Sequence, residues 1–325
     1  MRGRPKIHRL SEREIRACLH PDERMRFILA LVFVLIGLIL IVAGMVINWV
    51  EPFFSMPLEG AIIQSVIRIL GLLFGLLSFY VLLWIGTLFL RARLKAYAAE
   101  VNDTSLPEIE EVLSQVCLSL DYPRRSIEAF LIEQKIYGIG MLRSWRGRFL
   151  IVTSEIAESV YDYDAPGELA FFIASHVGAI RARMLRTAFI ARCSLVIAGI
   201  PVLGFFIRPY LRATVYSADR LALRVTDDLQ AALDAVAARI TGKDLASMVA
   251  LTAWIEQHQA LRYSFISFLI RMPSAEPHPV DRIANLLCYA LFEMPDQYLA
   301  LVRDMPDAKR RHLEEMLSAS RHAVV

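Results

Sequence analysis

Ser175 and His176 are two adjacent residues in the middle of the chain whose side chains could do chemistry, within "FFIASHVGAIRAR" at residues 171–183. A hydroxyl nucleophile beside an imidazole base would suit acyl transfer. Adjacent side chains on a helix diverge, however, and the sequence contains no G-x-S-x-G turn that would present the serine. The spacing therefore argues against a serine hydrolase.

A metal site is the second chemistry to consider, with His176, Asp219 and His278 as weak candidate ligands. On a helix, His176 stands about 100° round from Ser175, so it shares that face only if the helix rotates. We interpret His176 as a partly buried imidazole bonded to a neighbour. Asp219 is expected to pair with an arginine or to cap a backbone amide. His278 is expected to anchor the loop in front of Arg282.

Two long apolar runs precede these residues, at 27–50 and 69–90, and neither contains a charge. A bilayer core requires about 20 apolar residues in a helix, so both are predicted transmembrane helices. The first run is too long for the apolar core of a cleaved signal peptide and lacks a small-residue cleavage pattern. The sequence therefore predicts an N-terminal transmembrane helical hairpin with a short external loop at 51–68.

Charges on either side of the hairpin give its orientation. Residues 1–26 form a basic arm, whereas the loop at 51–68 carries a single arginine, Arg68. Arg91, Arg93 and Lys95 follow the second run. The excess of positive charge places both ends of the hairpin in the cytoplasm of a bacterial-type inner membrane. Within the arm, Ser11 and Glu14 predict a capping box on a short helix, and we interpret the arginines as an orientation signal.

The remaining chain, 91–325, is predicted to be a cytoplasmic domain of the α+β class, mostly helical around one small sheet. Residues 107–118 have helical apolar spacing, and two or three strands are expected to end at "RFLIVTS". Further helices are expected at the following ranges: 168–186, from near 210, 228–240, 245–262, 281–291 and 306–320. Pro166 suits the first turn of the helix that carries Ser175.

A third apolar stretch, 193–207, interrupts this domain between Arg192 and Arg208. It is short for a span, and Pro201 with two glycines would weaken a helix. We expect either a hairpin or re-entrant piece that enters the inner leaflet, or a buried core hairpin. Arginines on both sides suit lipid phosphates, so inner-membrane lipid is a predicted partner.

Composition narrows the class further. The chain of 325 residues is 56% hydrophobic and carries a net charge of only +3, and its basic stretches have no interleaved aromatic platform, so no nucleic-acid partner is expected. The four cysteines, Cys18, Cys117, Cys193 and Cys288, form no C-x-x-C pair. Their spacing suits neither a zinc knuckle nor a disulfide framework, which favours a reducing compartment.

Three blocks carry a resemblance to a known family. "ELAFFIASHVGAIRAR" (168–183) resembles E-L-x-x-V-x-A-H-E-x-G-H-I-x-x-R, "VYSADRLAL" (215–223) resembles E-[FY]-x-A-D-x-x-A-x, and "PHPVDRI" (277–283) resembles H-P-x-x-x-R-I. The strand "FLIVTSEI" before the first block also matches. In this order, the blocks resemble the HtpX-like membrane metallopeptidases over roughly residues 100–290. The resemblance implies a zincin-like domain beside the inner membrane.

The same resemblance implies where a zinc site would lie and shows that it has been lost. The first zinc histidine falls on Ser175, the catalytic glutamate on His176, and the second histidine on Ala179. The third ligand, a glutamate, falls on Val215, and the supporting aspartate is Asp219. Zinc requires about three protein ligands, which these side chains do not supply. No cofactor is therefore expected.

We accordingly expect a membrane-anchored pseudopeptidase, an inactive homologue of a zinc metallopeptidase that binds or regulates a membrane-protein partner. Two alternatives remain open. One is an active zinc endopeptidase with rearranged ligands, for which zinc would be the cofactor. The other is a structural subunit of an inner-membrane complex.

Overall fold

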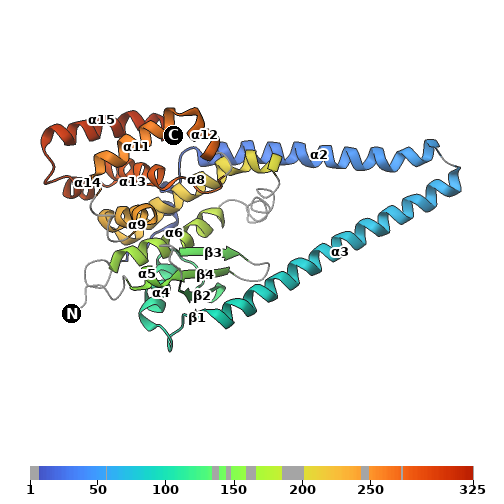
Figure 1. The fold of residues 1–325 in the computed structure, drawn as a ribbon, viewed down its shortest axis with the longest axis horizontal. Coiled ribbons are helices and arrows are strands. Elements are labelled where there is room, and N and C mark those ends of the chain that lie inside the picture. Colours follow the sequence, from blue (N-terminus) through green and yellow to red (C-terminus); the bar gives the residue numbers. More distant parts are fainter. Residues whose placement is uncertain are drawn as a thin grey trace.

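The computed structural model describes residues 7–55, 57–133, 139–143, 148–158, 166–184, 201–242, 249–271 and 274–324. Figure 1 shows a body of helices and one sheet, from which two long helices project. The body is a mostly helical α+β fold, as predicted.

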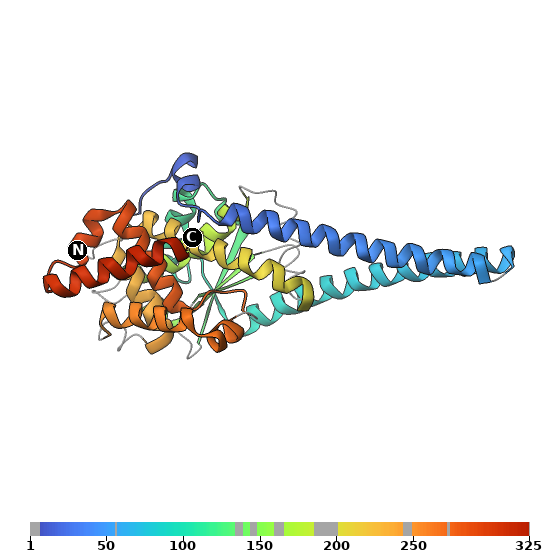
Figure 2. The same cartoon turned by 90° about the horizontal axis from the view of Figure 1, so that it is seen from above.

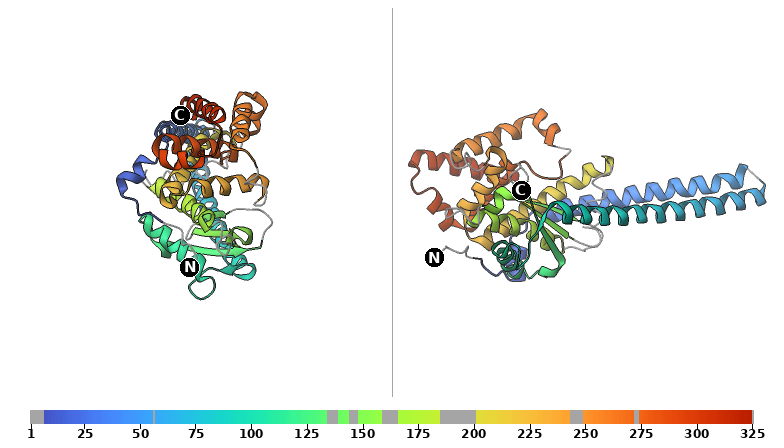
Figure 3. Two further views of the ribbon diagram at one scale, coloured as in Figure 1. Left: turned by 90° about the vertical axis from the view of Figure 1, so that its left-hand side faces the viewer. Right: turned by 60° about the horizontal axis from the view of Figure 1, so that its bottom comes forward.

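The projecting helices are α2 (Glu23–Ser55) and α3 (Leu58–Tyr97). They meet at the far end and separate toward the body, where α2 runs beside α8 and α3 ends next to the sheet (Figures 1 and 3). Large apolar side chains on both are exposed, among them Ile47 at 71% and Phe74 at 72%. A soluble protein rarely exposes such continuous apolar surface, so this surface is suited to another apolar environment.

By length and composition, one helix among the described residues could cross a membrane, Ile62–Tyr97 within α3. The predicted span at 69–90 lies inside it, and the predicted span at 27–50 lies within α2. The two helices extend well into the region expected to be a loop, 51–68. The predicted spans were bounded by the nearest charged residues. A helix continues through such residues until the backbone is interrupted, here near Pro57.

The sheet has four strands in the order β1-β2-β4-β3, one more than the largest number expected. The strands are β1 (Ala99–Glu100), β2 (Ile127–Ile132), β3 (Ile139–Arg143) and β4 (Arg148–Thr153). β2 and β4 are parallel, whereas β1 and β3 each pair antiparallel with their neighbour. The extra strand, β1, has only two residues, too few for a period-2 pattern to reveal it.

Alternation along the strands gives the sheet two apolar faces. One face carries Phe130 and Phe149, which pack against Leu94 at the base of α3. The other face carries Leu150 and Val152, which belong to the main core. The sheet thus holds the end of α3 on one side and the helices of the body on the other.

The helical part of the body is built on α6 (Pro166–Met184) and α8 (Pro201–Thr226), which pack extensively on each other. α6 has Pro166 in its first turn, as predicted, although the helix begins two residues before the expected start at 168. Its middle is almost entirely buried. The other elements of the body are α1 (Glu12–Ala17), α4 (Pro107–Ser119), a 3₁₀ turn (Arg124–Ser126), α5 (Ser154–Glu158), α9 (Leu229–Thr241), α11 (Leu251–Tyr263), α12 (Phe265–Arg271), α13 (Pro279–Glu293), α14 (Pro295–Leu301) and α15 (Asp307–Val324).

The segment at 193–207 is described only from residue 201 onward. Residues 201–207 form the first turns of α8, which begins nine residues before the expected start at Tyr210. Pro201 occupies the first helical residue, where the N–H that proline lacks has no intrahelical partner in any case. Residues 193–200, including Cys193, and Arg192 lie outside the described residues.

These first turns of α8 run antiparallel along α2. Tyr210 lies against Phe27 with ring centroids 5.2 Å apart, and Phe206 stacks on Phe33 at 3.8 Å. Phe205 is 40% exposed beside them. The apolar segment therefore accompanies α2 out of the body.

The N-terminal arm is more than an orientation signal. α1 has the predicted capping box between Ser11 and Glu14, but Ile15 and Cys18 are buried in the main core. Backbone bonds join His8 N–H to Val225 O at 2.8 Å and Leu10 N–H to Ser119 O at 3.0 Å. Residues 7–23 therefore form a strap across the body, which charge alone did not reveal.

Candidate functional site

The positions implied by the family resemblance lie where α6 packs against α8. Ser175 and Asp219 are both buried, and the serine Oγ donates a hydrogen bond of 2.9 Å to Asp219 Oδ1. Gly178 lies close to α8, because a Cβ at that position would be 3.4 Å from Leu221 Cβ. The two sequence blocks are thus brought into direct contact, with Ser175 facing Asp219.

The third block closes on the same carboxylate. Arg282, on α13, donates from Nε to Asp219 Oδ2 at 2.7 Å and from Nη2 to Oδ1 at 2.6 Å. Both side chains are buried, 4% exposed for Arg282 and 0% for Asp219. Burial opposes the charge on Arg282, but the Asp219 carboxylate outweighs it and raises the guanidinium pKa. Asp219 therefore pairs with an arginine, one of the two roles expected for it.

His278 positions that arginine. It is the N-cap residue of α13, and its Nδ1 accepts a hydrogen bond of 3.3 Å from the Val280 N–H. Its carbonyl accepts from Arg282 N–H at 3.2 Å, which starts the helix. The H-P loop thus fixes the beginning of α13, and Arg282 follows one turn later.

His176 is part-buried and bonded to its own helix. Its Nδ1 lies 2.8 Å from the Phe172 carbonyl oxygen, one turn earlier. Burial lowers the pKa of the imidazole, and the hydrogen bond to Phe172 only partly opposes this. The imidazole is therefore neutral near pH 7, and one nitrogen is occupied by α6 itself.

A zinc ion does not fit the residues at these positions. Ala179 and Val215 are partly exposed and have no donor atom. The Asp219 carboxylate is bonded through both oxygens to Arg282, and His278 Nδ1 caps α13. Among the described residues, no group of three His, Cys, Asp or Glu side chains is arranged to hold a metal ion. The weak candidate ligands His176, Asp219 and His278 are therefore each bonded to protein groups.

A second ion pair borders this cluster and was missed by sequence reasoning. Arg239, in the last turn of α9, lies 3.3 Å from the carboxylate of Glu276, just before the H-P loop. Burial and repulsion from Arg282 lower the pKa of Arg239. Neither residue falls within the three blocks, so no local pattern could have identified the pair.

A third contact, also missed, ties the strap to α8. Ser217 Oγ accepts a hydrogen bond of 2.8 Å from His20 N–H and also contacts the carboxylate of Glu23. Ser217 and Glu23 are completely buried. The one available signal was a glutamate four residues before the apolar run at 27–50, because a buried acid needs a partner.

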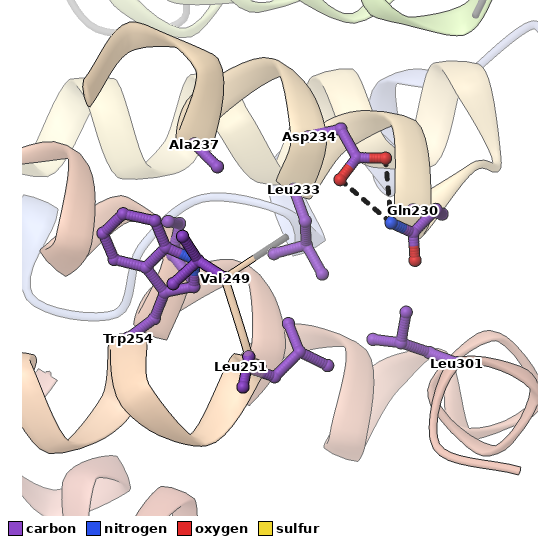
Figure 4. Close-up of a pocket in the computed structure, with 10 residues that line it drawn as sticks. Gln230, Leu233, Asp234, Ala237, Val249, Leu251, Trp254 and Leu301 are labelled. Carbon is purple, nitrogen blue, oxygen red and sulfur yellow. Dashed lines mark hydrogen bonds between the residues drawn. The ribbon is translucent and has the colours of Figure 1, made fainter. Parts of the chain in front are cut away.

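A pocket of about 240 Å³ lies elsewhere in the body, between α9, α11, α13 and α14 (Figure 4). Leu233, Leu251 and Trp254 give it apolar walls, and Gln230 bonds to Asp234 on one side of it. Its lining includes none of the residues discussed above. It is smaller than the usual 300–1,000 Å³ of a small-molecule site.

The fold and the site define a mostly helical α+β body that carries two exposed apolar helices and a buried Ser–Asp–Arg cluster. Comparisons of the chain with protein-family models, with curated proteins and with solved structures found no match. The resemblance to HtpX-like metallopeptidases therefore remains a prediction from the three blocks.

Proposed function

We propose that this protein is a membrane-anchored, inactive homologue of a zinc metallopeptidase, which binds or regulates a membrane-protein partner. One observation carries the proposal. The three blocks of the family pattern meet at Asp219, where Arg282 neutralises the carboxylate and Ser175 donates a hydrogen bond to it.

The chemistry of this cluster supports binding rather than hydrolysis. A zinc peptidase generates hydroxide because the metal lowers the pKa of bound water to about 7. Side chains at the vestigial positions Ser175, Ala179 and Val215 provide one neutral hydroxyl and no other lone pair. A bidentate arginine–carboxylate pair holds the same helices together without a metal.

Membrane anchoring is supported by dimensions as well as by composition. Arg68 and Arg91 bound the predicted span at 69–90, whose 22 residues measure about 33 Å as a helix. A bilayer core is about 30 Å thick, so one arginine would lie at each interface. The proposed location is a bacterial-type inner membrane, with the body in the cytoplasm.

The decisive test restores the four family residues. In the variant Ser175→His, His176→Glu, Ala179→His and Val215→Glu, one equivalent of zinc should bind, because the scaffold would again present three ligands. The unaltered protein should bind none, measured by elemental analysis after purification in detergent. Stoichiometric zinc in the unaltered protein, with casein cleavage abolished by a chelator, would contradict the proposal. Absence of zinc from the restored variant would contradict the resemblance.

The alternative of an active peptidase with rearranged ligands makes a separate prediction. Under this alternative the unaltered protein binds zinc, and the substitutions His176→Ala and His278→Ala each abolish that binding. If zinc binds and both variants retain it, these histidines are not the ligands and this alternative fails.

A structural subunit of a membrane complex is the second candidate function, favoured by the exposure of Phe74 at 72% and Leu77 at 60% on α3. Deleting residues 1–95 would remove the two projecting helices, but it would remove the strap as well. Point variants therefore distinguish better between a partner docked on these helices and a partner bound to the body. Phe74→Ala with Leu77→Ala should release a partner docked on the helices. Ala179→Glu should instead release a partner bound near α6. Copurification from a detergent extract measures both.

A further inference from the structure

The short helix α12 carries an apolar surface that the body leaves uncovered. Phe265 is 70% exposed and Ile266 is 69% exposed, more than any other large apolar side chain among the described residues after 98. Their exposure equals that of Ile47 on α2 and Phe74 on α3, at 71% and 72%. Water is a poor solvent for two adjacent apolar side chains of this size, so the surface is suited to an apolar environment.

Polar bonds at its C-terminal end fix α12 on the body. Arg271, the last residue of the helix, donates from Nη1 to Asp281 Oδ2 on α13 at 3.0 Å and from Nη2 to the Leu261 carbonyl on α11 at 2.7 Å. The other oxygen of Asp281 lies 2.8 Å from His258 Nδ1. Because these bonds hold the helix from its C-terminal end, the apolar side chains at its N-terminal end are left for another contact.

The loop after α12 shows where this helix lies relative to the predicted span of α2. Ala275 packs against a cluster formed between α2 and α8 by Ala30, Ile207, Tyr210 and Leu211. Ala30 is the fourth residue of the predicted span at 27–50, about 4.5 Å past its start. Four residues separate Arg271 from Ala275, and they cover at most about 14 Å. The C-terminal end of α12 therefore lies close to the level at which α2 enters the span.

The arrangement of the helices agrees with this contact. α12 lies at the end of the body from which α2 and α3 project (Figures 1 and 2). Figure 1 places α14 at the opposite end of the body. A membrane crossed by the two projecting helices would therefore have α12 at its cytoplasmic surface and α14 away from it.

We propose that α12 inserts Phe265 and Ile266 into the cytoplasmic leaflet of the bilayer that α2 and α3 cross. The occupant of this surface is lipid, because the neighbouring Ala275 already contacts α2 at the level of the span. Apolar residues of an interfacial helix reach about 5–10 Å into the boundary between headgroups and acyl chains. The inference rests on the membrane anchoring proposed above, and adds a second contact that restricts tilting of the body on the membrane.

The experiment uses the full chain in phosphatidylcholine liposomes, with one nitroxide label on an introduced cysteine. The labelled variants also carry Cys193→Ser, and the remaining cysteines are buried, namely Cys18, Cys117 and Cys288. Electron paramagnetic resonance then measures how often each label collides with oxygen, which concentrates among acyl chains, and with a nickel chelate, which stays in water. The two collision rates together give the depth of the label.

Labels at Phe265→Cys and Ile266→Cys should collide with oxygen, be protected from nickel, and lie at a depth of about 5–10 Å. Leu77→Cys is the control for lipid, because Leu77 is 60% exposed and about 12 Å from the nearer end of the predicted span at 69–90. Leu299→Cys is the control for water, because Leu299 is 45% exposed on α14. If one of the two α12 variants fails to fold, the other carries the test alone.

The outcomes separate this inference from the anchoring on which it rests. Nickel collisions on α12 as frequent as at Leu299, with a lipid-like label at Leu77, would overturn the inference and leave the anchoring intact. Protection of α12 from both reagents would also overturn it, because a protein surface would then cover the helix. A label at Leu77 that nickel reaches as readily as Leu299 would overturn the membrane anchoring and this inference together.

Discussion

The Asp219–Arg282 pair allows a quantitative test of the idea that an ion pair has taken the place of a metal. Arg282→Met leaves the Asp219 carboxylate buried with Ser175 as its remaining partner. Removing one member of a buried pair costs about 3–5 kcal/mol. Since each kcal/mol moves the midpoint of a body of this size by about 2–4 °C, the expected loss is about 6–20 °C.

The double variant separates the pair from simple loss of packing. Asp219→Leu with Arg282→Met removes both charges, and Ser175 is then free to bond a carbonyl of its own helix. Because two apolar side chains of similar volume can replace a buried pair at little cost, the double variant should be more stable than Arg282→Met alone. The difference from additivity measures the coupling of the two residues.

The assay is thermal unfolding of the full chain in detergent at one fixed scan rate, with resistance to a protease as a second readout. Arg310→Gln on α15 is the control, because its pair with Glu314 is about one-third exposed, 37% and 34%. Pairs of this kind contribute about 0.3–0.5 kcal/mol. A shift for Arg282→Met as small as that of the control would refute the reasoning. The reasoning would also be refuted if the double variant lost as much stability as Asp219→Leu and Arg282→Met lose in sum.

Three other changes test single contacts. Ser217→Val removes the hydroxyl shared by His20 N–H and the Glu23 carboxylate, so the body should lose about 1–3 kcal/mol, and a protease should cleave the strap sooner. The pKa of His176 is lowered from 6.5 in the folded protein, so the unfolded state binds the proton more readily. Stability should therefore fall as the pH drops below about 6.5. When unfolding is measured at several pH values, this fall should be smaller for His176→Gln than for the unaltered protein. Gly242→Ala at the end of α9, where φ is 80° and ψ is 163°, should lower the unfolding midpoint by the equivalent of about 1–3 kcal/mol.

Each of these has a result that would contradict it. An unchanged proteolysis rate for Ser217→Val would mean that the strap is held by its apolar side chains alone. If the stability of the unaltered protein and that of His176→Gln depend on pH in the same way, another group titrates in this range. An unaffected midpoint for Gly242→Ala would show that the backbone there relaxes freely.

The sequence by itself determined the features that depend on local periodicity and charge. Apolar spacing predicted α4, which the structure places at Pro107–Ser119, and α9, which ends before Gly242 as expected. Ser11 and Glu14 predicted the capping box of α1. Long uncharged runs predicted the two helices that project from the body, although their ends lie beyond the runs. Such signals are readable because one helix turn or one strand is enough to produce them.

The tertiary structure alone decided which distant residues meet. Arg282 and Ser175 were visible in separate blocks, but only packing of α6, α8 and α13 brings both onto the carboxylate of Asp219. The strap was misjudged because buried Ile15 and Cys18 contact elements far along the chain. Contacts between residues far apart in the chain produce no local pattern in a single sequence, because distance along the chain does not determine distance in the folded protein.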